Sequence, residues 1–506
     1  MRRRQFLCAS AGAGLALAAT GLGAATTAQD AYAPLGSVQL SNAREAVVSD
    51  DGETAYVAEM NGFTTVDVSD PADPTVLTTV TDILADREQG PFGALQDIKV
   101  DGDRLVVAGP PGPTQDALQG FLLYDVSDPA DPERLAFYES TALRDASRPH
   151  AVHNCYIDGD TVYLTGSDFE TEALVVVDIA ADQPELVATW APPDYDEAWS
   201  TVAPELYNLH DIYVQDGVAY LASWESGAWL IDVADPTSPS AVANVGGRPP
   251  SELQDVGRYE RFEPPGNAHY AQPNEAGDLL FVGGESWDVG RSETEGGPTG
   301  IDVWDISDPT AAERLATIDP PMPTDGDVTY QSGTWTTSHN FDVRGGRLYS
   351  SWYQGGVKIH DVSDPANPEE LAWWRSPDDR AFWTAQLAVD GEFFVASTMQ
   401  LGGSVPGLHT FPDSAGEMAD PPGSLVAGGS QDDPSDEGTD EPTDETPPDT
   451  DTPRGETTAP GGETDGEDEA DDPEGTAVNG PGFGLVAGAA GVGLGAARYL
   501  RENGDD

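Results

Sequence analysis

Cysteine and lysine are nearly absent from this chain. Its two cysteines are Cys8, close to the N-terminus, and Cys155, and a lone cysteine in the body of the chain excludes an intramolecular disulfide there. Lys99 and Lys358 are the only lysines among 506 residues, and 23 basic residues face 90 acidic ones. Because the binding of phosphates needs a basic face, this balance argues against nucleic acid as a partner.

Sequence signatures of the common catalytic sites are missing as well. The chain has no nucleophile elbow, P-loop, dinucleotide-binding fingerprint, HExxH zinc motif or EF-hand loop. Its apolar runs lie at the two ends, and both are short for a bilayer span, which needs about 20 apolar residues. A function must therefore be argued from composition, from internal repeats and from the few histidines.

Acidic residues are spread through the chain and are not confined to its C-terminal part. Asp and Glu are frequent throughout residues 40–410, and so acidic a chain repels itself unless concentrated counter-ions screen the charges. The composition resembles that of haloarchaeal proteins, which implies a salt-rich setting. The alternative interpretation is an ordinary acidic protein with a charged tail.

The N-terminus carries an export pattern. Arg3 and Arg4, followed by Phe6 and Leu7, match the R-R-x-F-L motif, and an Ala/Gly-rich apolar stretch comes next. This arrangement resembles a twin-arginine signal, so residues 1–33 are predicted to be a signal peptide that exports an already folded protein.

The C-terminal part resembles a surface-anchoring module. Residues 413–480 are rich in Asp, Glu, Thr, Pro and Gly, a composition that predicts a disordered, extended stalk. Residues 481–506 begin with Pro481, Gly482 and Phe483, continue with a short apolar run and end near two arginines. They resemble the PGF-CTERM sorting signal of archaeal surface proteins, which implies cleavage by an archaeosortase and attachment of a lipid anchor. The alternative is a retained, short apolar C-terminal helix. Both place the globular part outside the cell, anchored to the cytoplasmic membrane as part of the cell envelope.

A strand-and-turn unit recurs six times between these ends. Its clearest copy is GGVKIHDVSDPANP, in which an alternating strand is ended by Ser-Asp-Pro, because proline removes a ladder donor and Asp binds nearby backbone. The copies occupy residues 62–74, 120–132, 173–184, 227–239, 300–312 and 355–368. Three further short strands accompany each copy, so the sequence predicts an all-β propeller over residues 34–412.

The number of blades follows from the first strand of each unit. Seven such strands can be aligned, and the last unit lacks an outer strand, which residues 34–42 are predicted to supply by closing the ring. A ring of six blades is the alternative, if the first and last units merge. The array resembles the LVIVD-repeat family, whose signature is matched best by VVVDI at residues 175–179. The resemblance implies an extracellular β-propeller and says little about chemistry.

Four of the seven histidines occupy one position of the repeat, at the start of the first strand in consecutive blades: His153, His210, His269 and His339. The first strands of a propeller line its central channel, so these side chains are predicted to meet near one mouth of it. Imidazole nitrogens that converge can hold one transition metal ion, and Zn, Cu, Fe and Ni all accept them. We therefore predict a metal or ligand site there.

Five other polar residues are secondary candidates. Gln96 and Gln386 are aligned with the histidine position in the second and seventh blades, and His150 lies just outside it. Glu225 and Glu285 follow second strands, where they are predicted to be further ligands or partners of histidine N–H groups. The alternative is a wet channel mouth whose histidines were copied with the repeat and bind nothing.

Three functions fit these observations. The first is a surface-anchored extracellular binding protein with a metal or ligand site in the channel, its extracellular ligand left open. The second is an exported metal-dependent enzyme, an oxidase or hydrolase, that uses the same histidines. The third is a structural or adhesive envelope protein without a metal.

Overall fold

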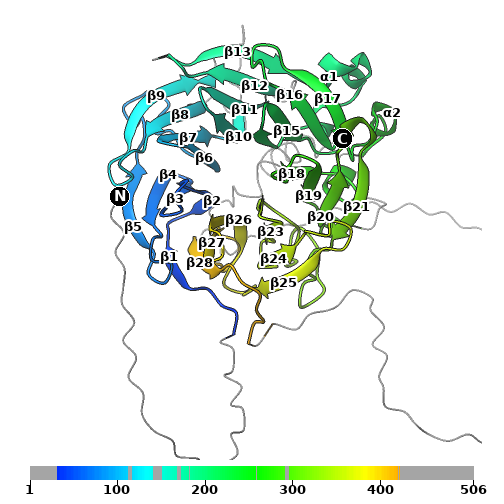
Figure 1. Cartoon of the computed structure of the whole chain (residues 1–506). Helices are drawn as coiled ribbons and strands as arrows, with labels where there is room; N and C mark the ends of the chain where they lie inside the picture. Colours follow the sequence, from blue (N-terminus) through cyan, green and yellow to red (C-terminus); the bar gives the residue numbers. More distant parts are fainter. Residues whose placement is uncertain are drawn as a thin grey trace, which may run out of the picture.

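The computed structural model describes residues 31–111, 117–140, 151–167, 172–181, 183–257, 259–290, 296–419 and 421. In this part of the chain, strands β1 to β28 form seven antiparallel sheets of four strands each. The sheets stand around a central axis as the blades of a propeller (Figure 1). The predicted fold with seven blades is confirmed, and the alternative of six blades is wrong.

Each blade runs outward from a strand at the axis. The first three blades consist of β2 (Ala43–Val48), β3 (Thr54–Glu59), β4 (Gly62–Asp67) and β5 (Thr75–Thr81); β6 (Asp97–Asp101), β7 (Arg104–Gly109), β8 (Gly120–Asp125) and β9 (Glu133–Glu139); and β10 (Ala151–Asp158), β11 (Thr161–Ser167), β12 (Glu172–Asp178) and β13 (Glu185–Trp190). The fourth and fifth consist of β14 (Asp211–Gln215), β15 (Val218–Ala222), β16 (Ala228–Asp232) and β17 (Ser240–Val245); and β18 (Ala268–Pro273), β19 (Leu279–Gly284), β20 (Ile301–Asp305) and β21 (Glu313–Ile318).

The last two blades complete the ring. The sixth consists of β22 (Phe341–Arg344), β23 (Arg347–Ser351), β24 (Val357–Asp361) and β25 (Glu369–Trp374), and the seventh of β26 (Phe382–Val389), β27 (Phe393–Thr398), β28 (Gly407–Pro412) and β1 (Gly36–Gln39). The recurring signature strand is thus the third strand of its blade, as the repeat pattern predicts.

The Ser-Asp-Pro segments form local turns that use their own acidic side chains. In the first blade, Asp67 Oδ1 accepts a hydrogen bond of 3.0 Å from the backbone N–H of Ser69, and Asp70 Oδ1 accepts one of 3.1 Å from Ala72. The equivalent aspartates of other blades make the same bonds two residues ahead. The repeated acidic residues therefore stabilise turns, as expected of Asx turns.

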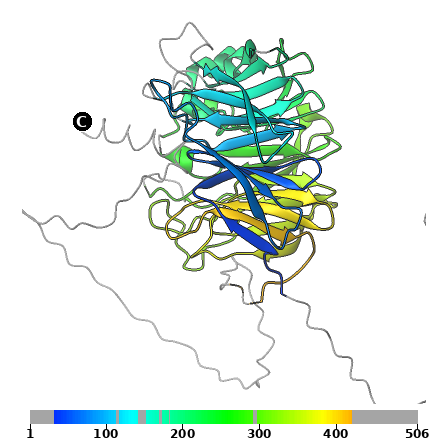
Figure 2. The ribbon, with the colours of Figure 1, turned by 90° about the vertical axis from the view of Figure 1, so that its left-hand side faces the viewer.

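The ring is closed by the N-terminal strand. β1 pairs with β28 in antiparallel register, with Gly36 opposite Thr410 and Gln39 opposite Gly407, and Figure 2 shows the dark blue strand lying beside the yellow strands of the last blade. The backbone N–H of Gly36 also donates to Thr410 Oγ1 at 3.0 Å. A Cβ atom on Gly36 would lie 2.6 Å from the carbonyl oxygen of Pro71 in the first blade. The predicted closure is confirmed, and it joins the two ends of the array.

Hydrophobic side chains between adjacent blades form the core. One such cluster joins Val106 and Phe121 of the second blade to Val152, Cys155 and Leu164 of the third. Outer strands face solvent on one side, as the alternating exposure of β5 shows.

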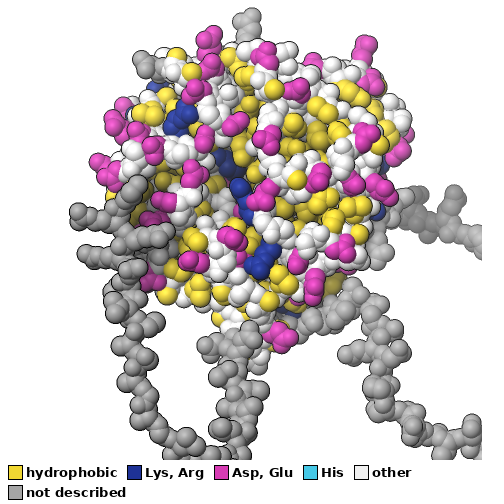
Figure 3. All heavy atoms as spheres, viewed as in Figure 1, with side chains coloured by type: hydrophobic (Ala, Val, Ile, Leu, Met, Phe, Trp, Pro, Cys, Tyr) yellow, Lys and Arg dark blue, Asp and Glu magenta, His cyan; other side chains and the backbone are white. Residues whose placement is uncertain are grey.

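Acidic side chains are scattered over the face of the propeller seen in Figure 3, and basic side chains lie near its centre.

Both lysines are buried. The Lys358 ammonium lies 4.8 Å from the ring centroid of Trp373 and 5.7 Å from that of Trp352, and it forms an ion pair of 2.9 Å with Glu370. Lys99 lies in the channel wall. Desolvation of its ammonium opposes the charge, but nearby carboxylates outweigh it and raise the pKa of Lys99.

Two longer connections add short helices on the side where the first strands begin, and one further short helix lies in a turn at the opposite end of a blade. Residues 191–206 carry α1 (Pro192–Tyr195) and the 3-10 helices η2 (Glu197–Thr201) and η3 (Pro204–Leu206); residues 246–266 carry α2 (Pro250–Leu253) and η4 (Glu260–Phe262); a further short helix, η5 (Pro309–Ala311), follows β20. None of the helices in the described ranges is both long and apolar enough to cross a membrane.

Several predicted features lie outside the described residues. They are Arg3, Arg4, Phe6 and Leu7 of the export pattern, nearly all of the stalk, the sorting motif Pro481, Gly482 and Phe483, and His150. For these the interpretation stays a prediction from sequence.

Candidate functional site

The start of each first strand presents one side chain toward the axis. Strand pairing fixes the equivalence: the ladders of β2, β10, β18 and β26 each shift register at this point, and these bulges place corresponding residues at corresponding heights. The seven equivalent residues are Arg44, Gln96, His153, His210, His269, His339 and Trp383. The predicted equivalence of the four histidines and of Gln96 agrees with this register.

The predicted equivalence of Gln386 is wrong. Trp383 occupies the histidine position in the seventh blade, and Gln386 lies three residues further along β26. Its Oε1 atom accepts a hydrogen bond of 2.7 Å from the backbone N–H of Val48. Gln386 therefore joins the last blade to the first and lies outside the histidine group.

The four imidazole rings lie side by side along an arc. His153 Nε2 and His210 Nε2 are 2.8 Å apart, the rings of His210 and His269 are stacked with centroids 3.7 Å apart, and the centroids of His269 and His339 are 4.6 Å apart. The structure thus brings together all four side chains that the repeat singled out.

Three of these four residues are buried, and His153 is partly exposed. His210, His269 and His339 are 6%, 2% and 3% exposed, which argues against the alternative of a wet channel mouth. Burial lowers the pKa of His153 to about 3 and holds the pKa values of His210 and His339 well below the ordinary value. Buried neutral imidazole is the form that coordinates metals.

Hydrogen bonds define which ring nitrogens carry a lone pair. His339 Nδ1 donates to the carbonyl oxygen of Trp383 at 2.6 Å, so the neutral ring has its lone pair on Nε2. His210 Nδ1 donates to the carbonyl oxygen of His269 at 3.1 Å, so the proton between His210 and His153 belongs to His153 Nε2. The His153–His210 pair is therefore satisfied internally, apart from His153 Nδ1.

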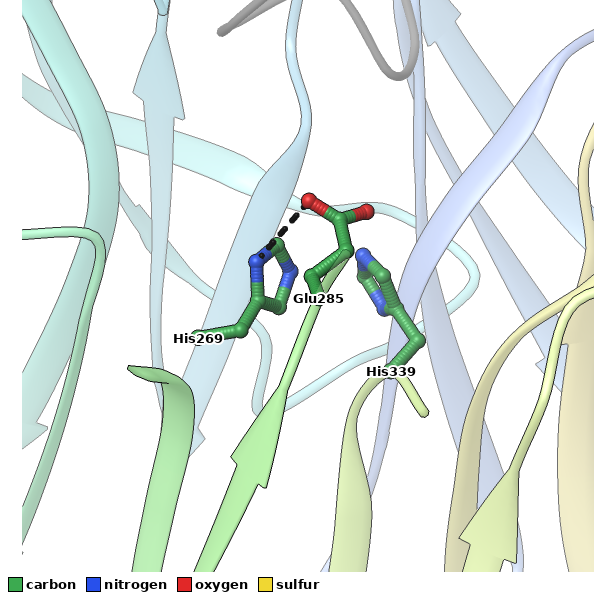
Figure 4. A group of neighbouring side chains, drawn as sticks. All are labelled: His269, Glu285 and His339. Atoms are coloured by element: carbon green, nitrogen blue, oxygen red, sulfur yellow. Dashed lines mark ion pairs between the residues drawn. The ribbon is translucent and has the colours of Figure 1, made fainter. Parts of the chain in front are cut away.

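Among the residues that the structure describes, His269, Glu285 and His339 form a group that could hold a metal ion. One ligand atom from each lies within 4.8 Å of the others (Figure 4). Glu285 Oε2 is 3.1 Å from His269 Nδ1, but this contact lacks hydrogen-bond geometry, and neither nitrogen of His269 has a hydrogen-bond partner. Glu285 comes from the end of β19 and reaches between the two rings.

Tyr353 holds Glu285 in this position. Its hydroxyl donates to Glu285 Oε1, and the tyrosine is fully buried. The backbone of Tyr353 has φ of 46°, in the left-handed region that a bulky residue rarely adopts and that is often found at functional sites. No pattern in the sequence indicated this residue, because it lies in the turn after β23, which the repeat does not align with the histidines.

Glu225, the other predicted carboxylate, lies outside the group. It accepts a hydrogen bond of 3.1 Å from Arg248, and burial raises its pKa to about 7 although Arg248 opposes the shift. Gln96 is 1% exposed at its equivalent position. Of the secondary candidates that the structure describes, Glu285 alone contributes to the group of possible ligands.

A second layer of polar side chains lies beside the histidines, one residue further along the first strands. Asn340 Nδ2 donates to Glu45 Oε2 at 2.8 Å, Asn154 Nδ2 donates to Asp211 Oδ2, and Lys99 forms an ion pair with Asp97. Burial raises the pKa of Glu45 to about 7, against the opposing charge of Lys99, and raises that of Asp211 well above its ordinary value. This carboxylate layer was not predicted from the sequence.

Two imidazoles and one carboxylate are a set that metals use in more than one chemistry. Three protein ligands with a further open position are typical of catalytic zinc, and two histidines with one carboxylate also bind non-haem iron. A metal ion held by such a set would keep an open coordination position, at which a small molecule could be bound or polarised.

Comparison with known proteins gives a family signal in two blades. The LVIVD repeat model matches residues 43–82 and 208–246, which are the first and fourth blades. No curated protein matches the chain.

Among solved structures, the β-propeller domain of Cps50 (Swd1) from Myceliophteria thermophila is 10% identical, with 76% of this chain and 100% of that chain covered and a TM-score of 0.47. The WD40 β-propeller domain of Doa1 is 10% identical, with 77% and 99% covered and a TM-score of 0.44. The chain described here is a seven-bladed β-propeller with LVIVD repeats in its first and fourth blades.

Proposed function

We propose that this protein is a cell-surface-anchored extracellular β-propeller that binds its ligand through a transition metal ion held by His269, Glu285 and His339. One observation carries the proposal: His269 is 2% exposed, and both of its ring nitrogens lack hydrogen bonds beside a carboxylate and a second imidazole. A buried polar group without a partner costs about 1–3 kcal/mol, and a metal ion bound to a lone pair would remove that cost.

The spacing of the ligand atoms supports a transition metal. With bonds of about 2.0–2.1 Å, two nitrogen ligands on one ion lie at most about 4.2 Å apart. The three atoms lie within 4.8 Å of one another, so small rotations of His269 and Glu285 suffice. His339 is already oriented by the Trp383 carbonyl, and Glu285 by Tyr353, as expected for supported ligands.

Motifs at the two ends of the chain support a location at the outer cell surface. Residues 1–33 resemble a twin-arginine signal and residues 481–506 resemble a PGF-CTERM signal, so the propeller would reach the outer surface folded and stay attached by a lipid or a short helix. The acidic composition suits a salt-rich exterior. The partner is then the cell envelope, and nucleic acid is not expected.

Elemental analysis of the exported, full-length protein tests the metal. We expect about one Zn, Cu, Fe or Ni ion per chain, and its loss in His269→Ala and Glu285→Gln, since each removes one of three ligands. His360→Gln and Glu225→Gln are matched controls, because both residues are buried and lie outside the group. Wild-type protein without metal, or metal retained in both ligand variants, would refute the proposal.

Cell fractionation tests the anchoring separately. Replacing Arg3 and Arg4 by lysine should leave the protein in the cytoplasm, and deleting residues 481–506 should release it into the medium. Wild-type protein found soluble inside the cell would contradict the proposed location without affecting the metal site.

The second candidate is an exported metal-dependent enzyme. It is favoured by the number of ligands, since a set of three leaves a coordination position for water or substrate. Binding of azide to the metal-loaded protein, followed by absorption or electron paramagnetic resonance, would support the enzyme. A coordinatively closed site, with His210 as fourth ligand, would instead support a structural metal ion.

A further inference from the structure

A chain of aromatic rings leads from the candidate ligands to the protein surface. The rings of His339 and Tyr353 have centroids 4.9 Å apart, those of Tyr353 and Trp335 are 5.6 Å apart, and those of Trp335 and Tyr330 are 5.2 Å apart and stacked. Tyr353 and Trp335 are buried, whereas Tyr330 is partly exposed. The rings therefore touch in sequence from the buried site to solvent.

We propose that the metal held at His269, Glu285 and His339 changes its oxidation state, and that Tyr353, Trp335 and Tyr330 carry single electrons between it and a soluble redox partner. This inference rests on the proposed metal site and narrows it to copper or iron, because zinc has no redox chemistry. Tyrosine and tryptophan are the most readily oxidised aromatic side chains, and electron transfer falls steeply with distance, so rings in contact favour short steps.

The charges around the first ring suit this role. The Tyr353 hydroxyl donates to Glu285 Oε1, so a carboxylate stands ready to accept the phenolic proton when the ring loses an electron. The hydrogen bond is charge-assisted and holds donor and acceptor together. The proton can return along the same bond when the ring is reduced again.

A competing route through Trp383 is disfavoured. Its ring centroid lies 4.3 Å from that of His339, closer than Tyr353. The guanidinium of Arg44, however, lies 5.4 Å from the centroid of Trp383. A cation over the ring face is attracted to an electron-rich ring and therefore opposes the removal of an electron from it. The positive charge of Arg44, and not the distance between the rings, therefore favours the path through Tyr353 over the one through Trp383.

The second ring of the chain is also supported. Trp335 Nε1 donates to the carbonyl oxygen of Tyr330 at 3.0 Å, and its ring centroid is 5.1 Å from that of Trp287. A carbonyl dipole and a neighbouring π-system stabilise positive charge on the indole. Trp335 is thus a suitable intermediate stop between the buried tyrosine and the partly exposed one.

The overall step is balanced. The reduced metal ion loses one electron, and a one-electron oxidant in solution that is strong enough to oxidise tyrosine, such as tris(bipyridine)ruthenium(III), gains it at Tyr330. No bond to carbon is made or broken, and the Tyr353 proton moves to Glu285 and back. The chain acts as a relay and is unchanged at the end.

The test uses full-length protein loaded with Cu(I) without oxygen, in which a laser flash generates tris(bipyridine)ruthenium(III), a cationic oxidant that is too bulky to enter a buried site and strong enough to oxidise tyrosine and tryptophan. Copper content is measured first. Wild type should show oxidation of Cu(I) to Cu(II) after the flash, and in Trp335→Phe this oxidation should be at least about tenfold slower, because phenylalanine cannot be oxidised in place of tryptophan. Tyr330→Phe, at a partly exposed position, is the second variant should Trp335→Phe fail to fold.

Trp190→Phe is the matched control, because Trp190 is a buried tryptophan packed on Trp229 in a different cluster. It should keep the wild-type rate. Zinc-loaded wild type should instead accumulate a tyrosyl or tryptophanyl radical, because zinc cannot supply the electron that would reduce it. Absence of copper from the wild-type protein would overturn the metal site and the relay with it. Full copper content with wild-type rates in both Trp335→Phe and Tyr330→Phe would overturn the relay alone.

Discussion

Replacing Lys99 by methionine should destabilise the propeller strongly. Lys99 is the cation among three buried carboxylates, those of Glu45, Asp97 and Asp211, and it forms an ion pair with Asp97. Methionine keeps the length of the side chain but removes the charge. Breaking a buried pair by removing one partner costs about 3–5 kcal/mol, so we expect a loss of that size in the free energy of unfolding at neutral pH.

The loss should depend on pH in a defined direction. Burial already raises the pKa of Glu45 to about 7, despite the lowering effect of Lys99, and removing the ammonium raises it further. A carboxyl whose folded-state pKa exceeds its unfolded value binds a proton more readily in the folded state. The destabilisation by Lys99→Met should therefore be largest above pH 7 and shrink as the pH falls toward 5.

Urea unfolding followed by tryptophan fluorescence, at constant high KCl concentration, measures the effect. The double variant Lys99→Met with Asp97→Asn should recover part of the lost stability, because the unpaired carboxylate is then gone. A change below about 1 kcal/mol in Lys99→Met, or no dependence on pH between 5 and 8, would show that the carboxylates are not confined with Lys99 as described.

Three further variants test other parts of the structure. Gly36→Val should cost about 1–3 kcal/mol by overpacking the closing strand, whereas Ser37→Val, exposed on the same strand, should stay within about 0.5 kcal/mol; equal urea midpoints would refute the proposed closure. Burial lowers the pKa of His409 to about 3, so below about pH 6.5 the unfolded chain binds a proton at this residue that the folded protein does not. The free energy of unfolding of wild type should therefore fall by about 2 kcal/mol more than that of His409→Phe between pH 7 and 5. Parallel pH profiles of the two proteins would contradict this. Tyr353→Phe should weaken metal binding about tenfold by freeing Glu285, within the range for such supporting residues, and an unchanged affinity in a competition titration would exclude a positioning role.

The repeat made most of the fold predictable from sequence. Strand alternation and the Ser-Asp-Pro turns recur in register, so the third strand, the blade count and the closing strand at residues 34–42 followed from pattern alone. The same register carried His153, His210, His269 and His339 to one arc, because equivalent residues of a ring share a height and a direction. Contacts between residues far apart in the sequence could thus be predicted from a short motif that recurs at regular intervals.

The misplaced Gln386 and the unpredicted carboxylate layer have one physical cause. A strand should alternate its side chains between two faces, but the bulges at the starts of several first strands turn consecutive residues toward the channel. That is why His153 and Asn154 both meet their neighbours in the next blade. In β26 the same bulge shifts the register, so alignment by glutamine missed Trp383.

Burial of the histidines could not be foreseen either. Tyr353 comes from a turn, and its place beside His339 depends on a left-handed backbone conformation that no repeat encodes. Glu285, which follows a second strand, lies beside His269, whereas Glu225, at a similar place, is engaged by Arg248 from a longer connection. The repeat pattern does not predict contacts made by the longer connections between blades, because these connections are not part of the repeat.

The two lysines have a practical consequence. Lys358 is wedged against indole rings and Lys99 is enclosed in the channel wall, so the folded chain offers acylating reagents no side-chain amine at its surface. Acylation of Lys358 would then report local unfolding of the sixth blade, and acylation of Lys99 would report opening of the strands around the axis. The two lysines can therefore show which part of the propeller unfolds first.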